Sequence, residues 1–504
     1  MTTIGKPGSR PTTYVKPEPK PEPVKQPAQA QRPDAVKTAV AQRMQDGFDA
    51  APRTASRPAA SAQGSDFEGA PPSTPGSAVG KAVANVANKI KDAAAASGPQ
   101  VSTNASGQTV VDLGTGNNTA TVSQGTDGSL TVTSGKDSVT LTAEQAKGAI
   151  IQGGDGNDSI TLDASVTQDL TVDGGAGNDK LTGGKGNDTL IGGAGNDSLI
   201  AGEGNDSVSG DDGDDYIEAG AGDDLVNGGA GRDVLYGLDG NDLLNGGEGR
   251  DYIDAGAGND TATGGAGDDQ VIGGRGDDSL TGGEGNDAVA GGAGKDTVNG
   301  NGGTDKLYVE EGEETADAAE GERTIVDMTD AEKRGSSVTV EGSPEFQARV
   351  QSDLDAMRSL PSGQDLLRTL DDSGHSTTIK ETTGGNSASA KNKDDAWFNA
   401  DGTPGKGTDG TVNYNTSRIS LGSEEWMNRP PVVALFHELV HASDYANGTL
   451  AVGEKNGTNN RETSAVGLPI DLDQNPATPD VVQGGRPGEN VLRDDLNLPT
   501  RPRY

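Results

Sequence analysis

Two histidines near the C-terminal end of the chain lie four residues apart, with a glutamate beside the first. They form the motif HELVH, residues 437–441, in a chain that contains three histidines and no cysteine. Side chains four residues apart project from one face of a helix, so His437 and His441 can bind one metal ion. This pattern is typical of a zinc site in which Glu438 is the general base for metal-activated water. The competing interpretation is a pair of partly buried histidines in a core helix.

A catalytic zinc needs a third protein ligand and an open position. Glu462, in "NNRETSAVGLPID", follows His441 at a distance close to that of zinc proteases whose third ligand is a glutamate from a following helix. Asp444 is the alternative, because aspartate can complete such a site. The longer motif HExxHxxGxxH is absent, since Asp444 and Asn447 stand where its glycine and third histidine would be. His375, in "DDSGHSTTIK", is expected in a solvated loop.

The helix that must carry these ligands has recognisable ends. Pro430 and Pro431 suit its first turn, and Asn447 followed by Gly448 suits its C-cap. Before it, the apolar spacing over residues 343–370 predicts two helices broken at Pro361.

Residues 411–422 alternate like a strand. We expect this strand, around Tyr414 and Ile419, to offer an edge to which an extended substrate peptide can add.

A nine-residue unit resembling "GGAGNDKLT" repeats along the middle of the chain. Its sixth position is aspartate at every step of nine from Asp179 to Asp305, and two residues later an apolar side chain recurs, with only Ala262 small. A glycine-rich turn allows positive φ, and the short strand after it places one apolar side chain inward. We therefore expect a parallel β-roll over residues 151–308.

The repeated aspartates predict calcium sites. Carboxylates stacked a few ångström apart repel unless a cation lies between them, and Ca²⁺ takes 6–8 oxygen ligands of this kind. An isolated unit, "GGDGNDSIT" at 153–161, adds one aspartate before the array, and Asp211 replaces a turn glycine in "SGDDGDDYI", where a single site is expected to be weak. The predicted calcium ligands are Asp158, Asp179, Asp188, Asp197, Asp206, Asp215, Asp224, Asp233, Asp242, Asp251, Asp260, Asp269, Asp278, Asp287, Asp296 and Asp305.

The charge of the chain is concentrated in this array. Residues 153–305 hold thirty-two Asp and Glu against six Lys and Arg, a net charge of −26 within a total of −38. Such a charge argues against nucleic acid and anionic membranes as partners and for divalent cations. Without calcium the array should stay expanded, and with calcium the binding free energy becomes folding free energy. We therefore expect it to fold only outside the calcium-poor cytoplasm.

Composition and segment boundaries indicate several domains. With 30% apolar residues, 3% aromatic residues and 78 glycines, 504 residues cannot build one core. No apolar run is long enough for a cleaved secretory leader or a membrane span. The expected layout is a disordered Pro/Ala/Ser-rich region (1–100), a β-rich cap (101–150), the all-β roll (151–308), an acidic linker (309–325), an α+β zincin-like HExxH domain (326–470) and a C-terminal tail (471–504).

Both parts resemble known families. The nonapeptide array resembles the repeats-in-toxin (RTX, hemolysin-type) calcium β-rolls. "HELVHASDYANGT", "NRETSAVGLPID" and "ENVLRDDLNLPTRPRY" resemble the gluzincin-like HExxH zinc protease effectors of type III secretion, over roughly residues 340–504. The second resemblance implies an endopeptidase with one zinc, held by His437, His441 and Glu462, with Glu438 as base.

Together these features predict a secreted zinc endopeptidase that acts on a host or competitor protein, with delivery into a host cell as one destination. The repeats favour type I export machinery and the C-terminal domain favours type III. The alternative is a calcium-dependent secreted surface or matrix protein whose HExxH domain is inactive. A third interpretation keeps the enzyme and makes the roll an export device alone.

Overall fold

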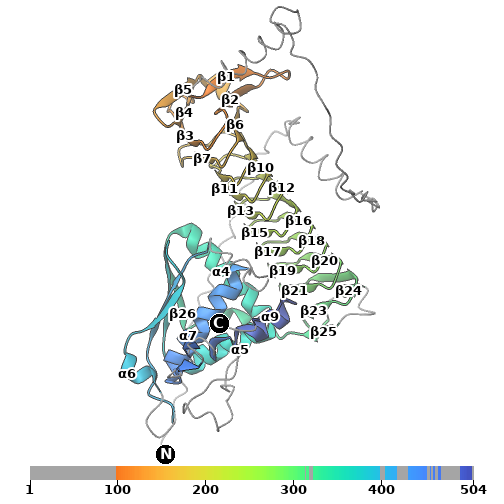
Figure 1. Ribbon diagram of the computed structural model, residues 1–504. Helices are drawn as coiled ribbons and strands as arrows, with labels where there is room; N and C mark the ends of the chain where they lie inside the picture. Colours follow the sequence, from red (N-terminus) through yellow and green to blue (C-terminus); the bar gives the residue numbers. More distant parts are fainter. Residues whose placement is uncertain are drawn as a thin grey trace, which may run out of the picture.

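The computed structural model describes residues 98–312, 314–316, 322–397, 403–416, 430–450, 454–455, 458–459, 464–466 and 488–501. Almost all of the region expected to be disordered, residues 1–100, lies outside these ranges. An elongated stack of strands runs from Gln100 to Ile325, and a smaller domain with helices packs beside its later turns (Figure 1).

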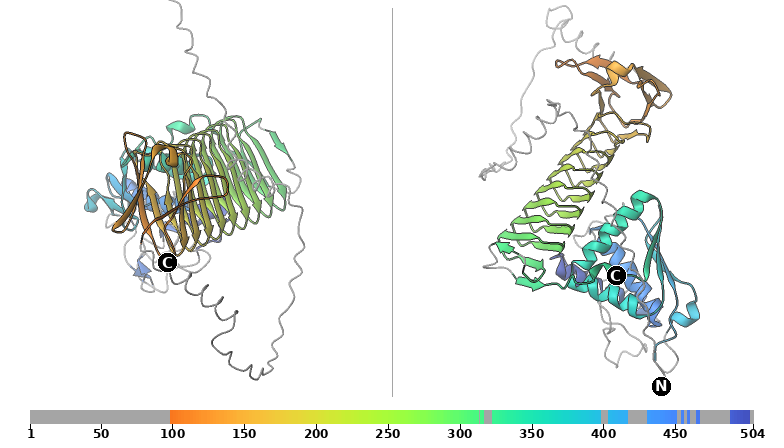
Figure 2. Two further views of the ribbon diagram at one scale, coloured as in Figure 1. Left: turned by 90° about the horizontal axis from the view of Figure 1, so that it is seen from above. Right: turned by 180° about the vertical axis from the view of Figure 1, so that it is seen from behind.

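Successive strands of the stack alternate between two sheets, so one full coil takes two nine-residue repeats (Figure 2). The first sheet has the order β1 (Gln100–Thr103), β2 (Thr109–Asp112), β6 (Ile150–Asp155), β8 (Thr171–Ala176), β10 (Thr189–Ala194), β12 (Ser207–Asp212), β14 (Leu225–Ala230), β16 (Leu243–Glu248), β18 (Thr261–Ala266), β20 (Ser279–Glu284), β22 (Thr297–Gly302) and β24 (Glu314–Ala316). The second has the order β25 (Glu322–Ile325), β23 (Lys306–Val309), β21 (Ala288–Ala293), β19 (Gln270–Arg275), β17 (Tyr252–Ala257), β15 (Val234–Asp239), β13 (Tyr216–Ala221), β11 (Ser198–Glu203), β9 (Lys180–Thr182), β7 (Ser159–Leu162), β3 (Thr119–Gln124), β4 (Leu130–Ser134) and β5 (Asp137–Leu141).

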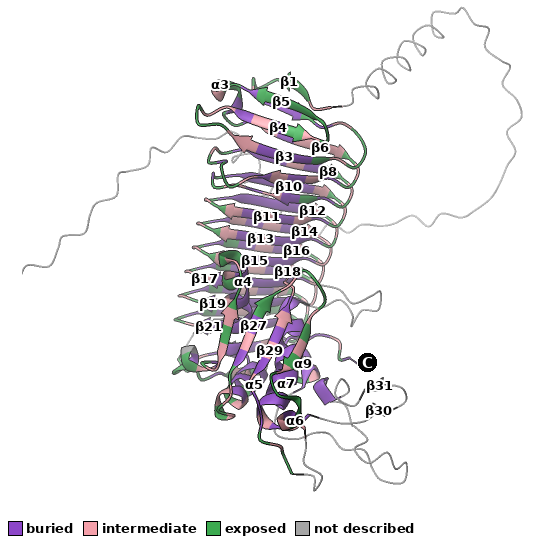
Figure 3. Ribbon diagram, turned by 90° about the vertical axis from the view of Figure 1, so that its left-hand side faces the viewer, coloured by how far each residue is buried: buried purple, intermediate pink, exposed green. Residues whose placement is uncertain are grey.

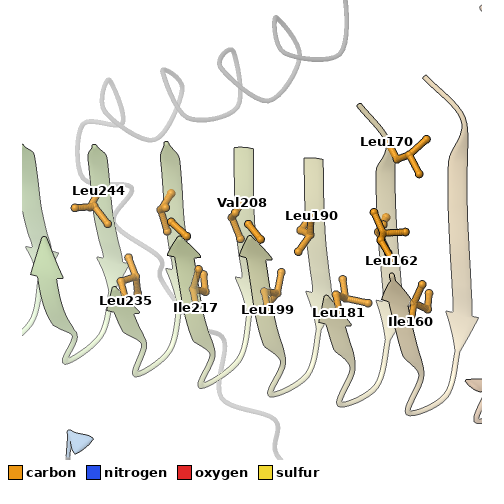
Figure 4. Packing of buried hydrophobic residues seen from close by; sticks show 14 of the residues in the cluster. Ile160, Leu162, Leu170, Leu181, Leu190, Leu199, Val208, Ile217, Leu235 and Leu244 are labelled. Atoms are coloured by element: carbon orange, nitrogen blue, oxygen red, sulfur yellow. The ribbon is translucent and has the colours of Figure 1, made fainter. Parts of the chain in front are cut away.

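Apolar side chains two residues after each repeat aspartate form the interior of the roll. Leu190 of β10 pairs in register with Val208 of β12, and Leu199 of β11 with Ile217 of β13. These side chains point between the two sheets and stack along the axis (Figure 4). Even Ala262 is fully buried. Burying a leucine or valine contributes roughly 1.5–3 kcal/mol, so this row stabilises the roll, and the predicted parallel β-roll is confirmed.

Glycine is required where one turn lies directly on the next. Gly258 has φ +151°, and a Cβ on it would lie 1.4 Å from the carbonyl oxygen of Gly240. A side chain there would both strain the backbone and separate the stacked turns.

Gly258→Ala should therefore lower the stability of the calcium-loaded roll, by more than the roughly 1–3 kcal/mol typical of a strained backbone position. Thermal unfolding followed by circular dichroism measures the change. The matched control is Gly302→Ala, because a Cβ on Gly302 meets nothing closer than 3.6 Å and its φ is not in the left-handed region. Equal melting temperatures for the two variants would contradict the assignment.

The two ends of the roll differ from its middle. At the N-terminal end, β3, β4 and β5 pair antiparallel and a short helix, α3 (Ala143–Ala146), follows, all within the same apolar core as the repeats. At the other end, the segment expected to be an acidic linker contains β24 and β25, which pair parallel with β22 and β23. An existing sheet edge offers backbone hydrogen bonds to any adjacent extended segment, so the roll continues beyond its last aspartate.

The C-terminal domain combines one small sheet with helices. The sheet has the order β26 (Val338–Glu341), β27 (Thr377–Glu381), β29 (Gly410–Tyr414) and β28 (Ser387–Ala390), and only β28 runs antiparallel to its neighbour. The helices are α4 (Pro344–Arg358), α5 (Pro361–Asp372), α6 (Lys393–Ala396), α7 (Pro431–Asn447) and α9 (Glu489–Asp495), with a 3-10 turn η1 (Ala331–Lys333) and a short pair β30 (Glu454–Lys455) and β31 (Thr458–Asn459). The predicted pair of helices broken at Pro361 is confirmed. No helix in the described ranges is long and apolar enough to cross a membrane.

The C-terminal domain and the roll share one apolar cluster. Tyr216, Tyr236, Tyr252 and Ile272, from the outer face of the second sheet, are buried in the same cluster as Val350 of α4. The helix α4 contacts β15, β17, β19 and β21, and the domain lies beside the later turns of the roll (Figure 3). The α+β domain is therefore built on the side of the roll rather than tethered to its end.

Candidate functional site

The repeat aspartates form two rows along the roll, because alternate repeats belong to alternate sheets. Within a row, the backbone N–H of one aspartate donates to Oδ1 of the aspartate eighteen residues later, as from Asp179 to Asp197 and from Asp197 to Asp215, each at 2.7 Å. All sixteen predicted calcium aspartates are buried. One carboxylate oxygen of each such residue thus holds the turn, which leaves the second oxygen for another partner.

That second oxygen is the feature that fits a cation. Oδ2 is buried and accepts no hydrogen bond from the described residues in Asp158, Asp179, Asp197, Asp215, Asp224, Asp233, Asp242, Asp251, Asp260, Asp269 and Asp287. A buried carboxylate oxygen without a partner is costly, and Ca²⁺ prefers oxygen ligands of this type. The donor set therefore fits calcium. At Asp188 the pattern differs, because its Oδ2 accepts the N–H of Gly184 at 2.8 Å.

Burial also makes these carboxylates hard to ionise without a cation. Burial raises the pKa of Asp215 to about 8 from 3.8, and the carboxylates of Asp233 and Asp197 add to the rise. Burial likewise raises the pKa of Asp224 and Asp251 to about 8. Near neutral pH the folded roll therefore needs either protons or cations at these positions.

The metal-free roll should become more structured as pH falls from about 9 to 5. The folded-state pKa of about 8 for Asp215 lies above its ordinary value of 3.8. The contribution of protonated Asp215 to the stability of the folded roll is therefore fully present below pH 3.8 and is lost as pH rises through about 8. Circular dichroism of metal-depleted protein across this range measures the effect. A spectrum independent of pH would contradict it, and calcium-loaded protein at pH 8 is the folded reference.

Asp211, expected to weaken a single site, has φ +72°, a conformation that favours glycine. Its Oδ1 accepts a hydrogen bond from the hydroxyl of Ser209 at 2.7 Å. Its negative charge also contributes to the raised pKa of Asp197 and Asp215. Leu238 shares the positive φ at the equivalent position of another turn.

The HELVH motif lies in the middle of α7, a buried helix with both predicted ends. Pro431 is its first residue, and Gly448, with φ +64°, caps it by donating its N–H to the carbonyl oxygens of Asp444 and Tyr445. The rings of His437 and His441 lie on one face with centroids 4.8 Å apart and nearly perpendicular. The exposed fractions are 2% for His437, 4% for His441 and 8% for Glu438, so Glu438 is the most accessible of the three.

Glu489 of α9 lies against one histidine of this pair. Its Oε2 lies 2.9 Å from Nδ1 of His437. The same carboxylate accepts from Nε of Arg493 at 2.7 Å and from Nη1 of Arg501 at 3.2 Å, and Glu489 is fully buried. A carboxylate on one ring nitrogen sets the tautomer and leaves Nε2 to bind a metal, the usual arrangement around metal-binding histidines. Two paired imidazoles, one oriented in this way, fit zinc.

Within the described residues, no third His, Asp, Glu or Cys side chain joins His437 and His441 in a group that could hold a metal. Glu462 lies outside the described residues. The carboxylate of Asp444 accepts a hydrogen bond from the hydroxyl of Thr449 at 3.0 Å, just beyond the end of α7. His375 is partly buried in a loop, with Nδ1 3.6 Å from Oδ1 of Asp409 and Nε2 3.3 Å from the carbonyl oxygen of Lys406.

The predicted peptide-binding edge at Tyr414 was wrong. The strand β29 lies between β27 and β28, and the ring of Tyr414 is buried with its hydroxyl donating to Asp353 at 2.9 Å. Ile419 lies outside the described residues. The strand predicted over 411–422 forms but ends at Tyr414. Which strand ends a sheet depends on its neighbours, and β26 and β28 are the edges here.

Sequence reasoning assigned no individual role to Glu489, Arg493 or Arg501 and placed all three in a tail. Glu489 and Arg493 lie four residues apart in α9, and this spacing of opposite charges is a recognisable helix signal. It could have predicted the helix. It could not have predicted contact with His437, which depends on how distant segments pack.

Comparison with known families gives two matches. Residues 334–504 match the family model of peptidase M91, described as an effector protein. Residues 150–165, 171–199, 191–226, 200–235, 209–244, 227–262, 245–280 and 281–313 match the RTX calcium-binding nonapeptide repeat. The comparison with curated proteins finds no match for the chain. Both resemblances drawn from the sequence are confirmed: RTX calcium-binding repeats, followed by a C-terminal domain similar to effector peptidases.

Proposed function

We propose that the protein is a secreted effector that acts as a zinc-dependent endopeptidase. His437 and His441 are the imidazole ligands, Glu462 is the third ligand, and Glu438 is the general base. The observation that carries the proposal is the buried imidazole pair on α7 with Glu489 against Nδ1 of His437. Metal-binding histidines usually place their second ring nitrogen against a carboxylate, and Glu489 supplies such a carboxylate here.

Zinc, Glu489 and Glu438 have separate roles in this proposal. Zn²⁺, when bound, supplies a Lewis acid that polarises the scissile carbonyl and lowers the pKa of water. Glu489 holds the ring of His437 so that Nε2 points away from α9. Glu438, the least buried member of the motif, takes a proton from the attacking water and returns it to the leaving amine. The burial of the site keeps bulk water from competing for these contacts.

We assign Glu462 rather than Asp444 as the third zinc ligand. The hydrogen bond from Thr449 directs the Asp444 carboxylate to the C-terminal end of α7. Glu462 comes from the chain after that helix, where zinc sites of this kind obtain a glutamate.

The repeats indicate where the protein folds and acts. Calcium sites of extracellular modules are tuned to about 10⁻⁴–10⁻³ M, so the roll would fold after export and stay open in the cytoplasm. We propose a protein of a host cell or a competitor as the substrate. Export would use machinery of type I, which the repeats favour, or of type III, which the C-terminal domain favours.

One observation favours a second candidate, a calcium-dependent surface or matrix protein with an inactive HExxH domain. It is the roll itself, in which eleven buried repeat carboxylates each keep a second oxygen that accepts no hydrogen bond from the described residues and that fits calcium. Under this candidate the roll is the working part, and the histidines only pack the domain.

Metal content separates the two candidates. Full-length, calcium-loaded protein should contain about one zinc per chain, the number that two histidines and one carboxylate hold, and His441→Ala should lose it. Inductively coupled plasma mass spectrometry of both metals measures this. Calcium content serves as an internal check that the roll is intact.

The matched control is His375→Ala, which removes a histidine from a loop and should keep the zinc. Glu462→Ala should lower zinc affinity more than Asp444→Ala does. Absence of zinc from wild-type protein would favour the surface-protein candidate, and equal zinc in wild type and His441→Ala would place the metal elsewhere.

A further inference from the structure

The short helix α9 touches the metal-binding helix at one end and the roll at the other. At its start, the carboxylate of Glu489 lies against His437 of α7. At its end, the carbonyl oxygen of Asp495 accepts a hydrogen bond from the hydroxyl of Tyr308 at 3.0 Å. Lys306 lies 3.3 Å from the carboxylate of Asp494 and also donates to its carbonyl oxygen. One element thus connects the two parts of the molecule.

The strand that holds α9 belongs to the last aspartate-bearing repeat. Lys306 and Tyr308 lie in β23, directly after Asp305. The backbone N–H of Asp287 donates to Oδ1 of Asp305 at 3.0 Å, and the N–H of Lys306 donates to the carbonyl of Asp287 at 2.7 Å. Beyond the helix, the side chain of Asn497 donates at 2.6 Å to the carbonyl of Asn286, which precedes Asp287 in the neighbouring turn. The contacts on α9 therefore exist only when this turn is folded.

A second contact fixes the domain on the roll independently of α9. The guanidinium carbon of Arg349, in α4, lies 3.2 Å from the ring centroid of Tyr236. Arg349 is 2.8 Å from Asp353 in its own helix and 3.6 Å from Glu218 in β13, and it is 1% exposed. A buried arginine needs these partners, and two of the three are residues of the roll. An unfolded roll would leave the α4 face without its cover.

We propose that Glu489 is a positioning residue for His437 and that the folded roll holds it there through α9. This inference rests on the proposed zinc peptidase. It adds that calcium binding in the roll controls the geometry of the zinc site more than 100 residues later in the chain. The roll is then a structural part of the peptidase, and an export role alone does not account for it.

The experiment measures metal binding at the histidine site rather than proteolysis. Full-length protein is depleted of metals by dialysis, because soluble calcium chelators also bind zinc. Zinc affinity is measured by competition with a chromophoric zinc indicator, with and without millimolar calcium. Visible absorption of Co²⁺-loaded protein reports the coordination of the metal, and His441→Ala provides the blank for Co²⁺ on the carboxylates of the roll.

Two variants test the two ends of α9. Glu489→Gln removes the charge beside His437, and loss of such a partner typically weakens metal binding by about 10–100-fold. The double variant Lys306→Ala/Tyr308→Phe removes contacts of the roll with α9 without replacing a repeat aspartate or an inward leucine, so it remains informative if Glu489→Gln fails to fold. Its matched control is Lys180→Ala, an exposed lysine that follows Asp179 at the same repeat position, in β9.

Compared with calcium-loaded wild-type protein, we expect weaker zinc binding and an altered Co²⁺ spectrum in Glu489→Gln, in the double variant, and in wild-type protein without calcium. Calcium-induced folding of the double variant, followed by circular dichroism, should match wild type, and Lys180→Ala should behave as wild type in every assay. Equal zinc affinity and equal spectra in all these samples would overturn the inference and leave the zinc site standing. Failure of wild-type protein to bind zinc even with calcium would overturn both the inference and the proposed function.

Discussion

Replacing Glu438 with Gln should lower peptidase activity by about 10²–10⁴-fold, the usual contribution of a general base. The amide has nearly the same size and shape as the carboxylate but cannot take a proton from water. Glu438 is 8% exposed. Because the amide keeps its size and shape, the buried contact of His437 with Glu489 should stay in place. The loss should therefore appear in kcat rather than in folding.

A peptide library derived from a whole proteome is a suitable probe, with cleavage sites identified by mass spectrometry. Wild-type protein with zinc and calcium should produce cleavages with a common sequence pattern, and Glu438→Gln should produce almost none. The variant's zinc content and calcium-induced circular dichroism should equal those of wild type. Persistent cleavage by the variant would show that another residue supplies the base.

Removal of calcium should abolish most of the strand structure of the roll at pH 8. The roll buries two rows of carboxylates whose second oxygens lack a protein partner at eleven positions among the described residues. At pH 8 the pKa of about 8 for residues such as Asp215 and Asp233 leaves many of these groups ionised, so they repel within a block of net charge −26. Because calcium binds the folded turns, its binding free energy becomes folding free energy.

Circular dichroism and small-angle X-ray scattering of metal-depleted protein, titrated with calcium, measure this transition. We expect strand signal to appear and the radius of gyration to fall together, with a midpoint of about 10⁻⁴–10⁻³ M. Magnesium at the same concentration is the control, because it demands octahedral geometry at shorter distances and should not replace calcium. A compact roll without calcium at pH 8 would contradict the prediction.

Replacing Glu438 and removing calcium should have different effects. The Glu438 variant should lose activity with its roll intact, whereas calcium removal should unfold the roll. Activity retained after complete unfolding of the roll would also contradict the coupling through α9.

Local sequence determined the roll and the metal-binding helix. The nine-residue period, with glycine at turns that need positive φ and an apolar residue two positions after each aspartate, allows only a coil in which equivalent residues stack. Leu190 beside Val208 follows directly from it. The two rows of aspartates follow from the same period. The helix α7 was predictable to both ends because Pro431 and Gly448 act through their own backbone conformations.

The tertiary structure decided everything that depends on contacts between distant segments. Tyr236 and Tyr252 alternate with inward residues and resemble ordinary outward-facing positions, and only the packing of α4 makes them buried. The strand β29 had the correct pattern but lies inside its sheet, because pairing order is set by neighbours.

Glu489 illustrates the same limit at the site itself. Its pairing with Arg493 is local, but its position beside His437 depends on where the roll and α5 leave space for α9. Periodicity and caps are properties of a few adjacent residues, and sequence alone determined what they control. The ion pair behind the zinc ligand and the attachment of the peptidase domain to the roll arise from packing, and only the folded chain decided them.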